Sequence, residues 1–365
     1  MADNRKIKVG ITHGDTNGIG YELILKTFSD PAMLELCTPV VYGSPKIAAY
    51  HRKAVGVETN YQIVGTAEEA QEGKLNLVTC LDDDVKITFG KPAEESGRAA
   101  FVALERAVKD CREGRVDVLV TAPINKNCIQ SESFHFPGHT EYIQENAGEG
   151  QEALMILMND TLRVALVTTH LPLKDIAGAV TQEAIEHKLR IFNASLKRDF
   201  QISKPRIAVL ALNPHAGDGG LLGEEEESII KPAMKAMEDE GVLTFGPFAA
   251  DGFFGSRAYD RYDGVLAMYH DQGLAPFKAL AMSDGVNFTA GLSLVRTSPA
   301  HGTAYDLAGQ GKADPSSFRQ AIYTAMDILR NRNRYDEAHA NPLRKQYHEK
   351  RDDSDKLNMI EKQER

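Results

Sequence analysis

Short apolar segments alternate with longer amphipathic segments over most of the chain. The short segments are apolar at nearly every position, which is typical of strands that are buried on both faces of a sheet. Eight strands are predicted on this basis, beginning at Ile7, Pro39, Leu75, Val116, Leu162, Arg206, Gly264 and Val286. The pattern therefore predicts an α/β protein with a mostly parallel sheet that carries helices on both sides.

The amphipathic segments predict the helices. We expect helices over Glu94–Glu113, Thr181–Lys197, Glu224–Glu240 and Ser316–Asn331, each with one apolar face. Thr181 stands where a helix N-cap is expected. Residues 333–365 differ from the rest, because acidic and basic residues are balanced there and apolar residues are few, so we expect a solvated helical or disordered tail.

Composition narrows the class of protein. The 365 residues are too many for one comfortable core, and no Pro/Ser-rich linker separates two halves, so we expect two lobes around a cleft with the chain crossing between them twice. The net charge of −10 disfavours general binding to nucleic acid. With no leader-like segment and no apolar run long enough to cross a membrane, a soluble cytoplasmic protein is expected.

The cysteines are scattered and include no C-x-x-C pair. They stand at Cys37, Cys80, Cys111 and Cys128. This spacing is typical of a reducing compartment and not of a disulfide or cysteine-zinc scaffold, so we interpret them as buried thiols.

Three histidines follow the ends of predicted strands: His170, His215 and His270. The carboxyl ends of parallel strands share one edge of a sheet, so side chains distant in sequence can meet there. Three neutral imidazoles that leave one position open are a known catalytic metal arrangement. The alternative is that each is an ordinary loop histidine, but the shared context of the three favours a metal site.

Two glycine-rich segments accompany these strands. The first, Gly14 to Gly20, has the spacing G-x-x-x-G-x-G and so lacks the dinucleotide fingerprint, which leaves a tight turn and a nucleotide contact both open. The second follows His215 and contains Gly217, Gly219, Gly220 and Gly223. Because glycine allows close approach of backbone to a ligand and positive φ, we interpret this second segment as a loop beside a site.

Other residues suggest that the ligand is an anion. His139 and Thr140 stand at a predicted helix start, where backbone N–H groups can bind an anion, although helix capping by Thr140 is an alternative. Lys278, Asn287 and Arg296 flank a predicted strand, and Arg296 could bind a phosphate with two donors. Taken alone each is a surface residue, but with the histidines they indicate a phosphorylated substrate and a metal.

Six segments in order resemble one known family. They read GDTNGIGYE, GHTEYI, LNPHAGDGGLLGEEE, MYHDQGLAPFK, GVNFTAGLSLVRTS and HGTAYDLAGQGKADPSSF. Together they resemble the 4-hydroxythreonine-4-phosphate dehydrogenases of pyridoxal phosphate biosynthesis, over about Ile7 to Arg330. The last segment is also similar to the adenosine-binding loop of isopropylmalate and isocitrate dehydrogenases.

The resemblance implies a fold with two α/β/α lobes of the isocitrate dehydrogenase type. Residues 1–130 with 285–332 would form a discontinuous NAD-binding lobe, 131–284 a lobe with the metal and the dimer interface, and 333–365 the tail. It implies a homodimer whose active sites lie at the interface, with metal ligands from both subunits. No nucleic acid or membrane partner is expected.

The resemblance also assigns residues. His170, His215 and His270 would bind a divalent metal (zinc, cobalt or magnesium), and His139, Thr140, Lys278, Asn287 and Arg296 would contact substrate. The loop with His301, Gly302, Thr303 and Asp306 would bind NAD. Lys278 is the first candidate for proton transfer, with a role as phosphate partner equally open, while Asp251 and Asp271 are candidates to orient His270 or the substrate amine.

The expected reaction is NAD-dependent oxidation and decarboxylation of 4-phosphohydroxy-L-threonine to 3-amino-2-oxopropyl phosphate. Three alternatives remain at this point. A related enzyme could oxidise 4-phospho-D-threonate or erythronate, where a hydroxyl replaces the amine. A metal-dependent phosphohydrolase would use the same histidines, and a noncatalytic metal-binding protein would explain the tail but not the phosphate-directed residues.

Overall fold

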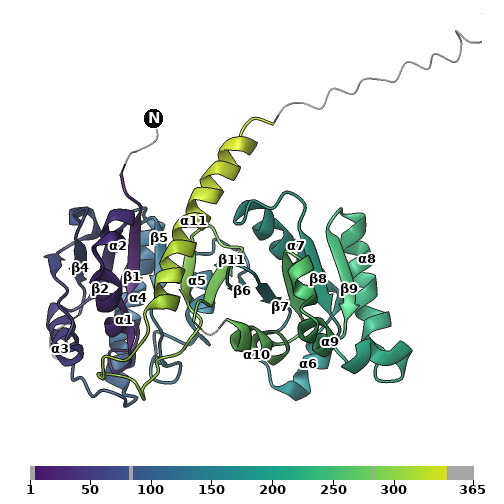
Figure 1. Cartoon of the computed structure of the whole chain (residues 1–365), viewed down its shortest axis with the longest axis horizontal. Helices are drawn as coiled ribbons and strands as arrows, with labels where there is room; N and C mark the ends of the chain where they lie inside the picture. The colour runs from purple at the N-terminus through teal and green to yellow at the C-terminus, as the bar shows by residue number, and fades with distance from the viewer. Residues whose placement is uncertain (1–4, 82–84, 282, 343–365) are drawn as a thin grey trace, which may run out of the picture.

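The chain folds around one twelve-stranded sheet (Figure 1). The structure is a computed structural model that describes residues 5–81, 85–281 and 283–342. Across the sheet the described strands are ordered β3 (Tyr61–Val64), β4 (Leu75–Thr79), β2 (Thr38–Gly43), β1 (Lys8–Thr12), β5 (Val118–Thr121), β12 (Arg296–Pro299), β11 (Val286–Ala290), β6 (Leu154–Met158), β7 (Arg163–Leu166), β10 (Gly264–Ala267), β8 (Arg206–Leu210) and β9 (Leu243–Phe248). Most neighbours are parallel, which confirms the predicted α/β class.

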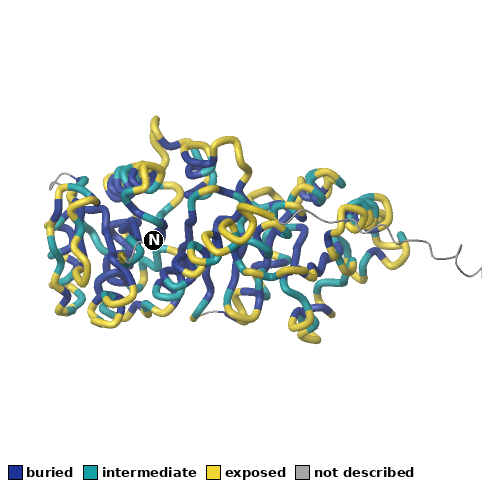
Figure 2. The backbone as a smooth tube through the Cα atoms, turned by 90° about the horizontal axis from the view of Figure 1, so that it is seen from above, coloured by how far each residue is buried: buried dark blue, intermediate teal, exposed yellow. Residues whose placement is uncertain are grey.

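Helices connect these strands and cover the sheet. They are α1 (Gly20–Phe28), α2 (Pro31–Leu36), α3 (Pro45–Val55), α4 (Glu94–Arg112), α5 (His139–Ala147), α6 (Leu173–Ala179), α7 (Gln182–Arg198), α8 (Lys231–Asp239), α9 (Ala250–Gly255), α10 (His270–Leu280) and α11 (Ser316–His339). Figure 2 shows the buried residues concentrated in the interior and the exposed residues along the outside of the molecule.

Both faces of the sheet are apolar, as continuous apolar strands require. In β5, Val118 and Val120 belong to the apolar cluster that includes Phe318 of α11, whereas Leu119 between them packs in the cluster that contains Leu104 of α4. Successive side chains of a strand point to opposite faces, so α11 and α4 cover opposite sides of β5.

A hairpin from late in the chain joins the two halves of the sheet. β11 and β12 are antiparallel to each other and lie between β5 and β6. The single strand predicted from Val286 is therefore wrong: the chain reverses after Ala290, where Gly291 has a φ of +86° and a Cβ would meet Glu152 O at 2.3 Å. Only glycine fits this turn without strain.

The predicted helices are present with two changes. Thr181 caps α7 as expected, since its hydroxyl accepts a hydrogen bond from the N–H of Ala184 at 3.1 Å. The helix expected over Glu224–Glu240 is a π-helical turn, Glu226–Ile230, followed by α8. Helix α11 continues to His339, into the segment predicted as a tail, and residues 343–365 lie outside the described residues.

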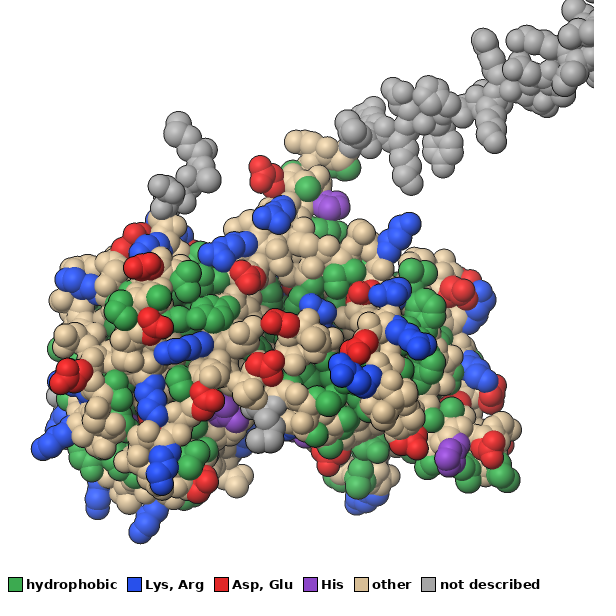
Figure 3. All heavy atoms as spheres, in the orientation of Figure 1, with side chains coloured by type: hydrophobic (Ala, Val, Ile, Leu, Met, Phe, Trp, Pro, Cys, Tyr) green, Lys and Arg blue, Asp and Glu red, His purple; other side chains and the backbone are tan. Residues whose placement is uncertain are grey.

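The proposed division into lobes stays a prediction, because the halves share one sheet and one apolar cluster spans them. On the face in Figure 3, acidic and basic side chains are interspersed.

All four cysteines are free, but only Cys37 is buried. The interpretation of four buried thiols is therefore wrong for the other three, which are half-buried. No helix in the described part of the chain is long and apolar enough to cross a membrane.

Candidate active site

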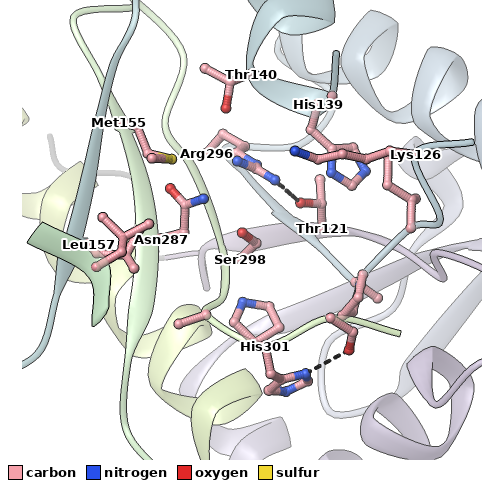
Figure 4. Close-up of a pocket in the computed structure, with 18 of the residues that line it drawn as sticks. Thr121, Lys126, His139, Thr140, Met155, Leu157, Asn287, Arg296, Ser298 and His301 are labelled. Atoms are coloured by element: carbon pink, nitrogen blue, oxygen red, sulfur yellow. Dashed lines mark hydrogen bonds between the residues drawn. The ribbon is translucent and has the colours of Figure 1, made fainter. Parts of the chain in front are cut away.

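A pocket of about 220 Å³ opens where the central strands end (Figure 4). Strands β5, β6, β11 and β12 contribute its floor and walls, and α5, α10 and the loop after β12 complete it. Of the residues predicted for substrate, metal and cofactor, the pocket wall contains His139, Thr140, His170, His270, Lys278, Asn287, Arg296, His301 and Gly302. The structure thus brings nine of the predicted residues into one pocket, although His139 and Gly302 are 163 positions apart in the chain.

Arg296 is a buried cation that forms no salt bridge with the described residues, although the charge of Glu141 acts on it. The residue is 3% exposed, and its guanidinium donates hydrogen bonds to two hydroxyls, Thr121 Oγ1 and Thr289 Oγ1. No carboxylate of the described residues forms a salt bridge with it, and burial lowers the pKa of its guanidinium to about 10. A buried charge normally has a partner, so this guanidinium is suited to receive an anionic ligand.

Three further polar atoms around the pocket lack partners in the described part of the chain. They are His139 Nε2, Asn287 Oδ1 and His301 Nε2, all buried. Burial and the nearby charges of Arg296 and Lys126 hold the pKa of His139 well below its usual value, so its imidazole is neutral. Because a buried polar atom without a hydrogen bond is costly, these atoms indicate that a polar ligand completes the site.

His170 stands between a cation and a carboxylate. Its Nε2 lies 2.9 Å from Lys126 Nζ, and its Nδ1 lies 3.6 Å from Glu141 Oε1. Glu141 is in the first turn of α5, and its pKa is lowered by its contacts with His170 and Lys126 although its partial burial acts against this. The site therefore contains a carboxylate at neutral pH among several cationic groups.

His270 begins α10 and faces His170, with 6.0 Å between the ring centroids. Asp271 Oδ1 lies 2.6 Å from His270 Nδ1, which leaves Nε2 free to bind a ligand. Asp271 therefore lies where it can orient His270, an arrangement common for metal-binding histidines, and this role stays a prediction.

His215 does not line this pocket. It lies in a neighbouring cavity with Asp251, Phe254 and Gln272, although its strand β8 is parallel and adjacent to β10 as the strand-end argument requires. No group of three or more His, Cys, Asp or Glu side chains within the described residues could hold a metal ion. One chain therefore brings together two of the three predicted metal ligands.

A left-handed turn holds His215 where it is. His215, Ala216, Gly217, Asp218 and Gly219 all have φ between +45° and +77°. Such a run costs roughly 1–2 kcal/mol at each residue that is not glycine. The buried carboxylate of Glu226 stabilises the base of the turn, because its Oε1 accepts hydrogen bonds from the N–H groups of Leu212 and Asn213, both at 2.8 Å.

The two glycine-rich segments differ in backbone conformation and in burial. Gly217, Gly219, Gly220 and Gly223 all adopt positive φ, as a loop built on glycine would. The N-terminal segment is buried: Asp15, Thr16 and Asn17 are at most 1% exposed, so this segment presents a turn and no surface to a nucleotide. Its role is to support the loop after β12, since Asp15 Oδ2 accepts a hydrogen bond from Tyr305 Oη at 2.7 Å.

The loop predicted to bind cofactor forms the rim of the pocket. His301 and Gly302 line the pocket, and a Cβ at Gly302 would meet no atom within 4 Å, which leaves space for a ligand against the backbone. Thr303 is half-buried and its carbonyl accepts the N–H of Ile19, while Asp306 is exposed. Lys278 of α10 also lines the pocket, and its charge acts on His301. Asp251 lies with His215 outside the pocket.

Sequence reasoning missed four polar residues of the pocket: Thr121, Lys126, Glu141 and Ser298. A signal for two of them was present, because Thr121 ends a predicted strand and Ser298 follows Arg296 at the spacing that puts two side chains on one face of a strand. The alternative that Thr140 caps α5 is wrong. The N-cap residue of α5 is Gly138, and no side chain forms a capping hydrogen bond there.

Comparisons with known proteins agree with this arrangement. The family model "Pyridoxal phosphate biosynthetic protein PdxA" matches residues 35–325. The chain is 66% identical to the 4-hydroxythreonine-4-phosphate dehydrogenase of Bacteroides thetaiotaomicron over 98% of both chains. It is 42% identical to that of Sulfurihydrogenibium over 89% of this chain and 99% of the relative. A crystal structure of the Klebsiella pneumoniae 4-hydroxythreonine-4-phosphate dehydrogenase superposes with a TM-score of 0.77 at 34% identity, covering 90% of this chain and 99% of the other.

Proposed function

Because the chain belongs to the PdxA family of pyridoxal phosphate biosynthetic proteins, we propose that it is a 4-hydroxythreonine-4-phosphate dehydrogenase. The proposed reaction oxidises the hydroxyl carbon of 4-phosphohydroxy-L-threonine with NAD as hydride acceptor and then releases carbon dioxide. The product is 3-amino-2-oxopropyl phosphate. The enzyme would be a cytoplasmic homodimer that requires a divalent metal.

The observation that carries this proposal is the unpaired Arg296 guanidinium in the wall of the pocket. A phosphate or carboxylate would supply the missing negative charge and accept two parallel hydrogen bonds from it. His139, Thr140 and Asn287 offer neutral donors and acceptors next to it, and Lys278 adds a second cation. This combination suits a small substrate with two anionic groups.

A divalent metal fits the pair His170 and His270. Both imidazoles can present Nε2 to the pocket, and neutral imidazole nitrogen suits zinc or cobalt better than magnesium. When bound, the metal would lower the pKa of the substrate hydroxyl and stabilise the negative charge that develops during decarboxylation. His215 is proposed as the third ligand, supplied across the interface of a homodimer.

Exposed apolar residues support this homodimer. Leu171 and Leu173 follow His170 and are 45% and 76% exposed, and Leu221 and Leu222 follow the His215 turn with 79% and 45% exposed. Exposed leucines at two separate segments beside predicted ligands suit burial against a second copy of the chain.

Different residues of the chain are proposed to bind the substrate, transfer the proton and hold NAD. Arg296 binds and orients the anionic group, and His139, neutral and buried, offers its Nε2 to the substrate. Lys278, with its side chain at the pocket, is positioned to return a proton to the carbon that loses carbon dioxide. Asp251 is proposed to act with His215 from the neighbouring cavity, and His301, Gly302, Thr303 and Asp306 are proposed to hold NAD at the rim.

The test is NADH absorbance after purified protein is mixed with 4-phosphohydroxy-L-threonine, NAD and zinc, cobalt or magnesium. Parallel reactions contain a chelator, NADP in place of NAD, or 4-phospho-D-threonate or erythronate in place of the amino substrate. NADH formation that the chelator abolishes, with the amino substrate alone, supports the proposal. Turnover with the threonate or erythronate alone would show that this hydroxy acid is the substrate. Phosphate release without NADH formation would favour a hydrolase.

A further inference from the structure

Lys126 occupies the side of His170 that a metal would need. Its ammonium lies 2.9 Å from His170 Nε2. An ammonium group has only donors, so Nε2 is the acceptor in this contact, while Nδ1 faces Glu141. The Nε2 lone pair of His170, which a metal would need, therefore already points at a cation in the pocket.

The backbone of Lys126 is fixed, but its side chain is not. Asn125 Oδ1 accepts hydrogen bonds from the N–H groups of Asn127 and Cys128, and Gln130 donates a hydrogen bond to the carbonyl of Lys126 at 3.1 Å. No carboxylate within residues 5–81, 85–281 and 283–342 forms a salt bridge with Lys126. The residue is exposed, so its long side chain can move its charge by several ångströms from a fixed base.

The ammonium of Lys126 can also point towards Arg296, where the anionic group of the substrate is proposed to bind. Figure 4 shows Lys126, His139 and Arg296 along one wall of the pocket. The charges of Lys126 and Arg296 both act on His139, which lies between them. An anion bound at Arg296 would therefore also attract Lys126.

We propose that Lys126 exchanges partners when ligands bind: it contacts His170 until a divalent metal binds there, and the metal displaces it towards the anionic group of the substrate at Arg296. The proposal rests on the proposed function, because it requires a metal at His170 and an anionic substrate. A dication and an ammonium cannot share one lone pair, so metal binding must release Lys126. The released charge then strengthens substrate binding, which couples the two ligands.

The test compares Lys126→Met with Lys174→Met in the full-length protein. Lys174 is an exposed lysine on α6, four residues after His170, and it does not line the pocket. Zinc affinity is measured without substrate by competition with a chromophoric chelator, and KM for 4-phosphohydroxy-L-threonine is measured at saturating zinc. Lys126→Ala, which also removes the donor, is the second variant if the methionine variant does not fold, and the same results are expected of it.

Lys126→Met should bind zinc about fivefold more tightly than wild type, since the competing donor is gone. Its KM should rise about tenfold because a charged donor to the substrate is lost. Lys174→Met should change neither value. Unchanged or weaker zinc binding by Lys126→Met, or an unchanged KM, overturns the exchange while leaving the dehydrogenase intact. Failure of wild-type protein to bind zinc overturns the metal role in the proposed function and the exchange with it.

Discussion

Thr121 Oγ1 accepts two hydrogen bonds from Arg296, one from Nε at 3.0 Å and one from Nη2 at 2.6 Å. Thr121 ends β5 and Arg296 begins β12, the neighbouring strand. The hydroxyl thus fixes the plane of a buried guanidinium from the adjacent strand, and Nη1 donates a hydrogen bond to Thr289 Oγ1 at 3.2 Å. Nη1 and Nη2 each keep a second N–H group for an anion. Thr121 is therefore a positioning residue for the anion site.

Replacing Thr121 with valine should raise the KM for the phosphorylated substrate roughly tenfold, since a hydrogen bond to a charged group is worth about 1.5–3 kcal/mol. Steady-state kinetics with NADH absorbance measure it. Thr121→Ser retains the hydroxyl and should restore a KM near that of wild type. An equal rise in the KM for NAD would show a general disturbance of the site instead.

Two inactive variants should restore activity to each other when mixed. If His215 serves the site of the partner subunit, His215→Ala and Arg296→Met damage different sites of a mixed dimer, and one intact site remains. Refolding the two variants together should give about a quarter of wild-type activity, because half of the dimers are mixed and each has one working site.

The control for this mixing experiment is a pair on one chain. His139→Ala with Arg296→Met should remain inactive after mixing, because both residues line the same pocket of one chain. If the His215 pair also remains inactive although mixed dimers form, His215 does not act across the interface.

The folded chain should lose stability as the pH falls from about 6.5 to 5. Burial lowers the pKa of His13 to about 3 and that of His51 to about 4. In this pH range the unfolded chain, with histidine pKa values near 6.5, binds protons that the folded chain does not, so acid favours unfolding. Each histidine should contribute about 2 kcal/mol of this loss by pH 5. Urea unfolding at pH 7.5 and 5 measures the difference.

His51→Gln tests the assignment. Glutamine can still donate to the carbonyl of Thr16, which His51 Nε2 contacts at 2.8 Å, but it does not titrate. The variant should lose less stability between pH 7.5 and 5 than wild type. An identical loss in the variant and wild type would show that His51 does not contribute.

Glu226→Gln should loosen the His215 turn. The carboxylate accepts hydrogen bonds from two backbone N–H groups, and the amide of Asn213 donates to it at 3.0 Å, so a glutamine NH₂ would face donors. The local cost should be roughly 2–3 kcal/mol, seen as faster hydrogen exchange of the Leu212 and Asn213 amides. Glu224→Gln, an exposed neighbour, should leave these exchange rates unchanged. Equal rates for both variants would remove Glu226 from this role.

The strands and helices that the sequence predicts best are those whose signal is local. Thr181 caps its helix through its own hydroxyl, and the buried strands are apolar at nearly every position. The β11–β12 hairpin was missed because the segment VNFTAGLSLVRT resembles one long strand, and Gly291 is the only glycine in it to mark the reversal. Strand β9 was missed because it lies at an edge, with Leu243 and Phe245 exposed.

For the site, the strand-end argument brought His170 and His270 together correctly, because neighbouring parallel strands do end at one edge. It could not place His215, whose position depends on a run of left-handed residues that the sequence permits but does not require. Lys126 was missed because it stands in a loop, and its contact with His170 joins residues 44 positions apart. Contacts of that kind depend on the tertiary arrangement and leave no local pattern.

The late hairpin also fixes the order in which the molecule can be completed. A chain made from its N-terminus can pair β1 to β5 early, but β5 and β6 have no contact through the sheet until β11 and β12 have been synthesised. Until then β5 and β6 are both unpaired edge strands on the sides that β12 and β11 will later cover. A nascent chain that stops before Val286 lacks β11, β12 and Arg296, so the pocket forms only once most of the chain exists.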